Sequence, residues 1–339
     1  MPDQGTAAPG APRLARVLRP APAAASTWGT AAGLAAGIIV DRAVGDPRRG
    51  HPVSAFGRLA SAAERCTHRD SRAVGSAFAA ALTSGAVVLG AAGARAARPS
   101  PAGTAAVTAL ATWAVVGGTT LGREGRQMAR LLQADDVAGA RARLPHLCGR
   151  DPSVLDVDGL ARATVESVAE NTSDAVVAPL LWGAVAGVPG LLGYRAVNTL
   201  DAMVGHRSER YLRFGWASAR LDDVANLMPS RLTALLAVAL APTVGGRSSR
   251  AVRTWRRDGR RHPSPNAGPV EAAFAGALGR TLGGRLSYAG RVEDRPLLGD
   301  GPAPDVDDVA RAVRLSTAVA MAAAFLAVLT RLGIDRWRA

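Results

Sequence analysis

Two neighbouring stretches without a charged residue decide the fold: AVGSAFAAALTSGAVVLGAAGA at 73–94 and PSPAGTAAVTALATWAVVGGTTLG at 99–122. They are 22 and 24 residues long, and arginines bound both of them. A helix that crosses a bilayer needs about 20 mostly apolar residues. Their Gly, Ala, Ser and Thr content suits close helix packing in lipid. The pattern therefore favours a transmembrane helical hairpin over a pair of buried, alanine-rich helices in a soluble domain.

Four shorter apolar stretches extend this pattern. The stretches at 27–40 and 315–330 can span a bilayer if the flanking arginines extend toward the headgroups. The stretches at 175–194 and 232–246 contain proline and glycine, so we interpret them as re-entrant or interfacial segments. The predicted fold is an all-α, multi-pass helical membrane protein with re-entrant or interfacial segments and long cytoplasmic loops.

The polar, motif-bearing segments set the expected topology. They are 41–72, 123–174, 195–231 and 247–314. One active site built from all four requires either that neither middle apolar segment spans or that the site lies within the membrane plane, and we favour the first arrangement. The arginine-rich segments 195–231 and 247–314 are expected in the cytoplasm by the positive-inside rule. We expect one integral-membrane domain over 27–331, a disordered leader over 1–26, and no internal repeat.

Composition excludes several classes of protein. The chain has 41 basic residues, all of them arginine, and a net charge of +14. The absence of lysine rules out a P-loop lysine and a lysine Schiff base. The arginines are dispersed among acidic residues and aromatics make up 4% of the chain, which argues against nucleic-acid binding. The positive charge instead suits an anionic membrane face and phosphate or carboxylate substrates.

Three carboxylates, Glu166, Glu170 and Asp174, recur every four residues. On a helix this spacing places them on one face. A solvated acidic face is the alternative, but the apolar segment 175–181 follows directly. The cluster points to a divalent metal, most simply Mg²⁺, or to cationic substrate groups, with Asn171 as a neutral ligand or amide donor.

A second acidic pair, Asp222 and Asp223, follows Arg220. Such a group can hold Mg²⁺ bound to phosphates, and Arg207 and Arg220 can clamp phosphate oxygens. Helix capping by the two aspartates stays open as the alternative.

Other polar residues lie in turn-forming sequences. Asp46 and His51 stand in Gly-Asp-Pro and His-Pro sequences at the end of the first apolar stretch, where capping and turn formation are equally good explanations. The loops at 262–269 and 282–288 are rich in proline and glycine, and their backbone N–H groups could face an anion.

The ordered set of motifs resembles the CobD/CbiB family of cobalamin biosynthesis over residues 27 to 330. The motifs that carry the resemblance are Asp41, Gly45-Asp46-Pro47, His51-Pro52-Val53, Gly149-Arg150-Asp151, Glu166, Glu170-Asn171-Thr172, Asp174, Ala178-Pro179-Leu180, Asn198-Thr199-Leu200-Asp201, Ala219-Arg220-Leu221-Asp222-Asp223 and Ser264-Pro265-Asn266-Ala267-Gly268.

This resemblance implies an adenosylcobinamide-phosphate synthase in the cell membrane. Such an enzyme joins adenosylcobyric acid to (R)-1-amino-2-propanol O-phosphate through an amide bond, with ATP and Mg²⁺ as the implied cofactors. It implies the corrinoid, the aminopropanol phosphate and the bilayer as partners, with association with other cobalamin-pathway enzymes as a further expectation. The alternative is a membrane sensor or regulator of the AmpE type on the same scaffold.

Together, the residues and the resemblance give a site hypothesis. Catalytic roles are assigned to Asp46, His51, Glu166, Glu170 and Asp201, with Asp201 or His51 as the general base toward the amine. Substrate and phosphate binding is assigned to Arg150, Asn171, Asn198, Arg207, Arg220 and Asn266. Metal binding is assigned to Asp174, Asp222 and Asp223.

Overall fold

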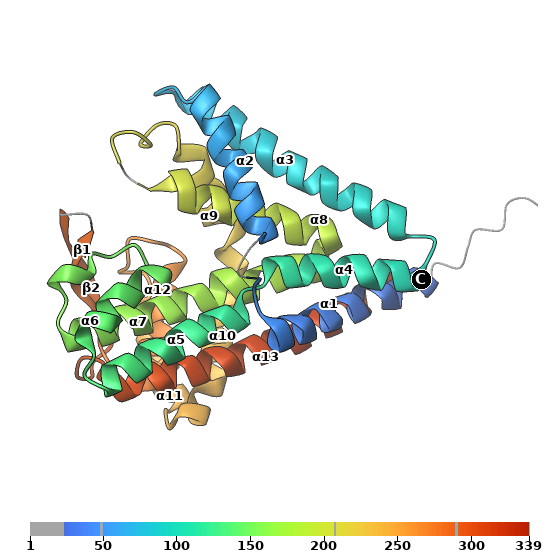
Figure 1. Cartoon of the computed structure of the whole chain (residues 1–339). Coiled ribbons are helices and arrows are strands. Elements are labelled where there is room, and N and C mark those ends of the chain that lie inside the picture. The colour runs from blue at the N-terminus through green and yellow to red at the C-terminus, as the bar shows by residue number, and fades with distance from the viewer. Residues whose placement is uncertain (1–23, 48–49, 207, 289–290, 339) are drawn as a thin grey trace, which may run out of the picture.

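The computed structural model describes residues 24–47, 50–206, 208–288 and 291–338 (Figure 1). Its α-helices are α1 (Ala24–Val44), α2 (Pro52–Thr67), α3 (Arg72–Ala97), α4 (Pro101–Val115), α5 (Gly118–Gln133), α6 (Val137–Arg143), α7 (Val157–Thr172), α8 (Ala178–Leu200), α9 (Trp216–Ala225), α10 (Leu227–Leu240), α11 (Ser248–Asp258), α12 (Ala267–Leu278) and α13 (Val306–Arg338). Two π-helical turns, Ser173–Val177 and Asp201–Gly205, follow α7 and α8. The disordered leader expected over 1–26 lies outside the described residues up to residue 23, and residues 24–26 belong to α1, where disorder was wrongly expected.

Five helical segments are long and apolar enough to cross a membrane, so the chain has the all-α, multi-pass fold that its sequence predicts. They are Arg72–Ala97, Pro101–Gln133, Val157–Gly205, Leu227–Val244 and Val306–Trp337. Helix α1, where a span was predicted at 27–40, is not among them in the described part of the chain, because Asp41 and several Gly, Ser and Thr residues lower its hydropathy. The segments predicted to be re-entrant, 175–194 and 232–246, overlap two of the five.

Helices α1 and α4 pack closely through a stripe of small residues, side by side in Figure 1. Successive turns pair Gly29 with Thr104, Gly33 with Thr108 and Gly37 with Thr112. A Cβ atom at Gly33 would lie 2.5 Å from the Thr108 Cβ and 2.6 Å from the Ala105 carbonyl oxygen. In lipid, such close backbone approach replaces the hydrophobic driving force as the source of helix association.

Helix α8 is broken near its middle. Gly187 has φ +65° and ψ −146°, a backbone conformation that side chains beyond glycine rarely adopt. The two halves fold back on each other. The evidence is a hydrogen bond at 3.2 Å from the Tyr194 hydroxyl to the carbonyl oxygen of Asp174, which lies 20 residues earlier. A continuous helix would separate these residues by about 30 Å. The segment is a helical hairpin, so the backbone is broken in the region where the sequence predicts a break.

The two ends of this hairpin carry closely similar short sequences. Residues 171–177 read NTSDAVV and residues 198–204 read NTLDAMV, and each runs into one of the π-helical turns. This repeat corrects the expectation that the chain has none. Gly187 lies about midway between the two copies, so the reversal brings both to the same end of the hairpin. Single π-helical turns occur frequently at functional sites.

A β-hairpin replaces the loop expected at 282–288. Strands β1 (Leu282–Tyr288) and β2 (Arg291–Leu298) pair antiparallel, with Gly284 opposite Arg295. The glycines that suggested a loop serve a bulge instead, since Gly283 and Gly284 have φ values of +89° and +86°. The fully buried Leu282 and Leu298 attach the base of the hairpin to the helical core.

Helix α13 fixes the remaining helices around the hairpin of α8. It runs along α1, α5 and α7 (Figure 1) and is buried against them through Val309, Val313 and Val319. At Gly125 of α5, a Cβ atom would lie 2.5 Å from the Val313 side chain. Helix α7, which carries the acidic motif, is therefore held in place by α5 and α13.

Replacement of Gly33 by leucine tests the α1–α4 contact. We expect G33L to destabilise the detergent-solubilised protein by about 2 kcal/mol or more, because the added side chain forces the two backbones apart. The measurement is thermal unfolding of purified protein. The control is G85L, since a Cβ atom at Gly85 meets nothing within 4 Å. Equal stability of the two variants would refute this account of the packing.

Candidate functional site

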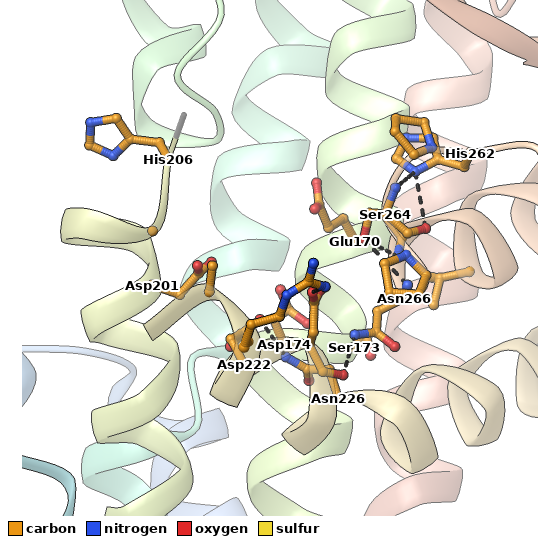
Figure 2. Close-up of a pocket in the computed structure, with 18 of the residues that line it drawn as sticks. Glu170, Ser173, Asp174, Asp201, His206, Asp222, Asn226, His262, Ser264 and Asn266 are labelled. Carbon is orange, nitrogen blue, oxygen red and sulfur yellow. Dashed lines mark hydrogen bonds and ion pairs between the residues drawn. The ribbon is translucent and has the colours of Figure 1, made fainter. Parts of the chain in front are cut away.

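A cavity of about 490 Å³ opens where α7, α9, both π-helical turns and the loop before α12 converge (Figure 2). Seven of the predicted site residues line it: Glu170, Asp174, Asp201, Arg220, Asp222, Asp223 and Asn266. They come from segments far apart in the sequence, and the α8 hairpin brings them together. The volume is typical of a site for a small molecule.

One wall of the cavity is acidic. Glu170 ends α7, Asp174 and Asp201 occupy the two copies of the repeated motif, and Asp222 lies on α9. The four-residue spacing along the sequence therefore predicted correctly that Glu170 and Asp174 share one face. Asp222 lies in the second half of α9, so it does not cap the start of a helix, contrary to the capping alternative.

Asn226 holds the acidic wall together. Its amide nitrogen donates to the Asp222 carboxylate at 2.9 Å, while its carbonyl oxygen accepts from the Tyr194 hydroxyl at 2.9 Å. Asn198 makes a longer contact with Asp222, at 3.5 Å. Since Asn226 is buried and Tyr194 belongs to the returning half of α8, this chain of hydrogen bonds fixes α9 to the hairpin.

Burial raises the pKa of Asp222 to about 6. Hydrogen bonds from Asn226 and Asn198 oppose the shift, and the charges of Asp223 and Glu170 add to it. A carboxylate that changes its charge near neutral pH is suited to exchange a proton or to be neutralised by a bound cation.

The opposite wall is basic and polar. His262 is 7% exposed, and its Nδ1 accepts a hydrogen bond from the Ser264 backbone N–H at 3.0 Å. The Arg295 guanidinium lies 3.1 Å from the His262 Nε2. Asn266 donates to the Asp223 carbonyl oxygen at 2.8 Å and accepts from Arg231, which ties this loop to α9 and α10.

Glu166 lies behind the cavity. Its carboxylate pairs with the buried Arg150 and accepts a hydrogen bond from the Gly283 backbone N–H at 2.6 Å. The N–H that was expected to face an anion therefore faces this carboxylate. Glu166 and Arg150 do not line the cavity, so the geometry gives them a positioning role, in which they hold the β-hairpin against α7.

Glu271 of α12 is a further buried acid next to this pair. It is 2% exposed, and its Oε1 lies 3.9 Å from the His262 Nε2. Burial, and then the charges of Glu166 and Glu170, raise its pKa well above the usual value, while Arg150 and Arg295 oppose the shift.

Six predicted residues do not line the cavity, and a seventh, Arg207, lies outside the described residues. The six are Glu166 and Arg150, described above, and Asp46, His51, Asn171 and Asn198. Asp46 and His51 pair with each other at 3.5 Å, and His51 caps α2 by accepting from the Val53 N–H, so the capping interpretation describes its observed contacts. Asn171 donates to the Ser167 carbonyl oxygen at 2.8 Å.

Several lining residues were not assigned a role from the sequence. They are Ser173, His206, Tyr211, Trp216, His262, Ser264 and Arg295. The repeated NT-x-DA motif was a usable signal for Ser173, and the His-Pro-Ser-Pro-Asn run was one for His262. Arg295 carried no signal, because only the β-hairpin brings it to the cavity.

The donor set is suited to a hard cation without forming a complete cage. Within the described residues, no group of three or more His, Cys, Asp or Glu side chains is arranged to hold a metal ion. The Ser173 hydroxyl is buried, lines the cavity, and has no hydrogen-bond partner in the described structure. One or two carboxylates with substrate phosphates commonly complete a Mg²⁺ site, so these oxygens fit such an ion.

The fold and the cavity define a multi-pass helical membrane protein with a polar cavity between the α8 hairpin and its neighbouring helices. The family model described as CobD/Cbib protein matches residues 34–316. The chain belongs to this family of cobalamin biosynthesis. No solved structure matches it.

Relatives cover nearly the whole chain. A protein of Mycobacterium tuberculosis strain H37Rv, named cobalamin biosynthesis protein CobD, is 56% identical over 306 residues, which are 90% of this chain and 97% of that protein. Proteins of the same name from Chromobacterium violaceum and Geobacter metallireducens are 42% and 44% identical, over 82% and 78% of this chain and 89% and 84% of their own lengths.

The raised pKa of Asp222 predicts a pH-dependent stability. The folded protein holds this proton up to a pH of about 6 and the unfolded chain releases it near 3.8, so stability falls as the pH rises through this window. Between about pH 5 and about pH 7.5, we expect the free energy of unfolding of the wild type to fall by about 1 kcal/mol more than that of D222N. Thermal unfolding at both pH values measures this, with D307N, at an exposed position of α13, as the control. An identical pH response of D222N and wild type would contradict the assignment.

Proposed function

We propose that the protein is an adenosylcobinamide-phosphate synthase, which forms an amide between adenosylcobyric acid and (R)-1-amino-2-propanol O-phosphate at the expense of ATP. Membership of the CobD/CbiB family supports the pathway. The observation that carries the reaction is the cavity with an acidic wall facing a basic one, which matches a substrate with an ammonium group and a phosphate group.

Amide formation needs an activated carboxyl group, because a carboxylate does not react with an amine unaided. In the proposed sequence, the corrinoid carboxylate attacks the ATP γ-phosphorus, and ADP leaves. The amine then attacks the acyl carbon, and inorganic phosphate leaves. The ammonium group must lose a proton before it attacks, and Asp201, which lines the acidic wall, is the proposed acceptor.

The cavity suits the small substrate and the reacting groups. The cavity has a volume of about 490 Å³, and the proposal requires only the carboxylate-bearing side chain of the corrinoid to enter it. Mg²⁺ would be held by Asp174 and Asp222 with the Ser173 hydroxyl, and would neutralise the charge that develops on phosphate oxygens. Arg220, on the rim, would contact phosphate, while Asp223 pairs with Arg220 at 3.3 Å.

The proposed setting is the cytoplasmic membrane, with the cavity open to the cytoplasm where ATP is present. The arginine-rich segments around the cavity support this orientation through the positive-inside rule. A non-catalytic sensor of the AmpE type is the competing function, and a family fold alone does not separate the two. Formation of the amide product distinguishes the synthase from the sensor.

The first experiment is a reaction with purified protein in detergent, adenosylcobyric acid, aminopropanol phosphate and MgATP. We expect ATP-dependent formation of the amide, seen by mass spectrometry. E170A and D174N should reduce the rate at least about 100-fold, because each removes charge from the acidic wall. D307N serves as the control. Wild-type protein that binds both substrates and makes no product would favour the sensor.

A second experiment measures Mg²⁺ binding as a function of pH. Because Asp222 ionises with a pKa of about 6, Mg²⁺ affinity should rise as the pH rises through this value and level off above it. Isothermal titration of Mg²⁺ in the presence of a non-hydrolysable ATP analogue measures the affinity. D222N should bind more weakly and lose most of the rise. An affinity that is independent of pH in the wild type would argue against Asp222 as a ligand.

A further inference from the structure

A second, smaller cavity lies between α1, α5 and α13, where α13 runs along both of the other helices (Figure 1). It has a volume of about 130 Å³ and continues into an open groove of about 450 Å³ along α5 and α13, because Arg126, Thr317 and Met321 line both. We call this combined surface the α13 groove. Its basic residues are Arg42, Arg126 and Arg314. Among the described residues it shares no lining residue with the candidate functional site, so it is a separate feature of the molecule.

The α13 groove lies where two membrane-spanning segments end. The uncharged stretch 315–330 of α13 begins directly after Arg314, and the uncharged stretch that runs from α4 into α5 ends four residues before Arg126. The residues that precede the two arginines are in contact, since a Cβ atom at Gly125 would lie 2.5 Å from the Val313 side chain. Arg126 and Arg314 therefore stand at one level, and phospholipid headgroups occupy this level at the ends of spanning helices.

Arg42 reaches the α13 groove from the third helix. It follows the apolar stretch 27–40 of α1, and its Nη1 lies 3.3 Å from the Met321 Sδ. Met321 lies seven residues after Arg314, which is about 10 Å along a helix, so Arg42 stands deeper than the other two arginines. A long arginine side chain at such a depth extends toward the headgroups or draws a phosphate group toward itself.

The three guanidinium groups have charge to offer a ligand. All three arginines are exposed, and within the part of the chain that the structure describes none of them forms an ion pair with a carboxylate. One acid lines the narrow end of the groove, Asp41, whose Oδ2 accepts from the Thr119 N–H at 3.1 Å and from the Thr119 hydroxyl at 2.9 Å. Asp41 is thus engaged at the start of α5, and three arginines outnumber it.

The remainder of the α13 groove is mainly apolar. Ala310, Val313 and Ala318 line its open part. From Met321, exposed apolar side chains continue at every fourth residue of α13, at Phe325 and Leu329, and so form one stripe along the helix. A basic head region joined to an apolar stripe matches a ligand that has an anionic group at one end and a long apolar tail at the other.

We propose that the α13 groove binds one phospholipid with an anionic headgroup. Arg42, Arg126 and Arg314 hold its phosphate, because guanidinium groups pair with phosphate oxygens through two parallel hydrogen bonds. An acyl chain lies along the stripe of α13. Basic pockets between spanning helices are typical sites for anionic lipid headgroups. The lipid site does not depend on the proposed reaction.

A lipid in this groove also supports the fold near the candidate functional site. Val176 lines the narrow end of the groove and belongs to the π-helical turn that carries Asp174. The bound lipid therefore contacts this turn from outside the polar cavity. Because a ligand that binds only the folded state stabilises it, the lipid should raise the temperature of unfolding.

Native mass spectrometry of delipidated protein in detergent tests the site. The protein is titrated with phosphatidylglycerol and, in parallel, with phosphatidylcholine that has the same acyl chains. Wild type should bind the first phosphatidylglycerol at least about tenfold more tightly. The triple variant R42Q/R126Q/R314Q should lose most of this preference, while its affinity for phosphatidylcholine changes less than about twofold. Phosphatidylglycerol should also raise the unfolding temperature of the wild type more than that of the triple variant.

The matched control is R95Q/R98Q/R130Q, which removes the same number of charges at exposed arginines outside the α13 groove. It should keep the wild-type preference. Equal losses in the two triple variants would show a general attraction to anionic lipid and would overturn the proposal. If R42Q/R126Q/R314Q fails to fold, R314Q alone takes its place and should lose part of the preference.

Two further measurements separate a lipid from a soluble anion. Glycerol 3-phosphate carries the phosphate without acyl chains, so it should not displace phosphatidylglycerol at equal concentration. A318W fills the open part of the groove and leaves the arginines in place, and it should weaken phosphatidylglycerol binding. Efficient displacement by glycerol 3-phosphate, or unchanged lipid binding in a folded A318W, would contradict a phospholipid as the occupant.

Discussion

The structure depends on bringing half-buried carboxylates of like charge together at one end of a helical hairpin. Asp174 and Asp201 repel each other, and each loses hydration when it leaves water. Only the reversal at Gly187 places them at one cavity, and the hydrogen bonds from Tyr194 through Asn226 to Asp222 hold α9 against the same end. The fold therefore maintains an unfavourable cluster of charge that a cationic ligand would relieve.

The same constraint explains the positioning residues. Glu166 resembles a catalytic residue in the sequence because it shares a helix face with Glu170. Its ion pair with Arg150 neutralises its charge. Its hydrogen bond from the Gly283 N–H attaches the β-hairpin to α7. A buried carboxylate that has two good partners is part of the scaffold, whereas one that faces the cavity can take part in chemistry. Burial and partners separate these roles, and spacing along a helix does not.

The sequence predicted what depends on length, charge and local periodicity. Charge-free stretches of spanning length predicted the membrane fold, and the four-residue spacing predicted the position of Glu170 and Asp174. It could not predict contacts made by long-range packing. Arg295 reaches the cavity because glycines form a bulge rather than a loop, and His51 stays outside because it caps α2. The repeated motif was present in the sequence, but its meaning depends on the reversal between its copies.

The two copies of that motif also show how one short sequence can serve two functions. In the first copy, the Thr172 hydroxyl donates to the Val168 carbonyl oxygen, and in the second the Thr199 hydroxyl donates to the Arg195 carbonyl oxygen, each four residues back. The π-helical turn that follows then turns an aspartate toward the cavity. The surroundings differ, because Asn171 contacts the loop at Leu147 and Asn198 contacts Asp222. Both copies share the threonine hydrogen bond and the π-helical turn, while the neighbouring residues determine the contacts of each aspartate. In the mechanism that we propose, Asp174 would bind the cation and Asp201 would receive the proton.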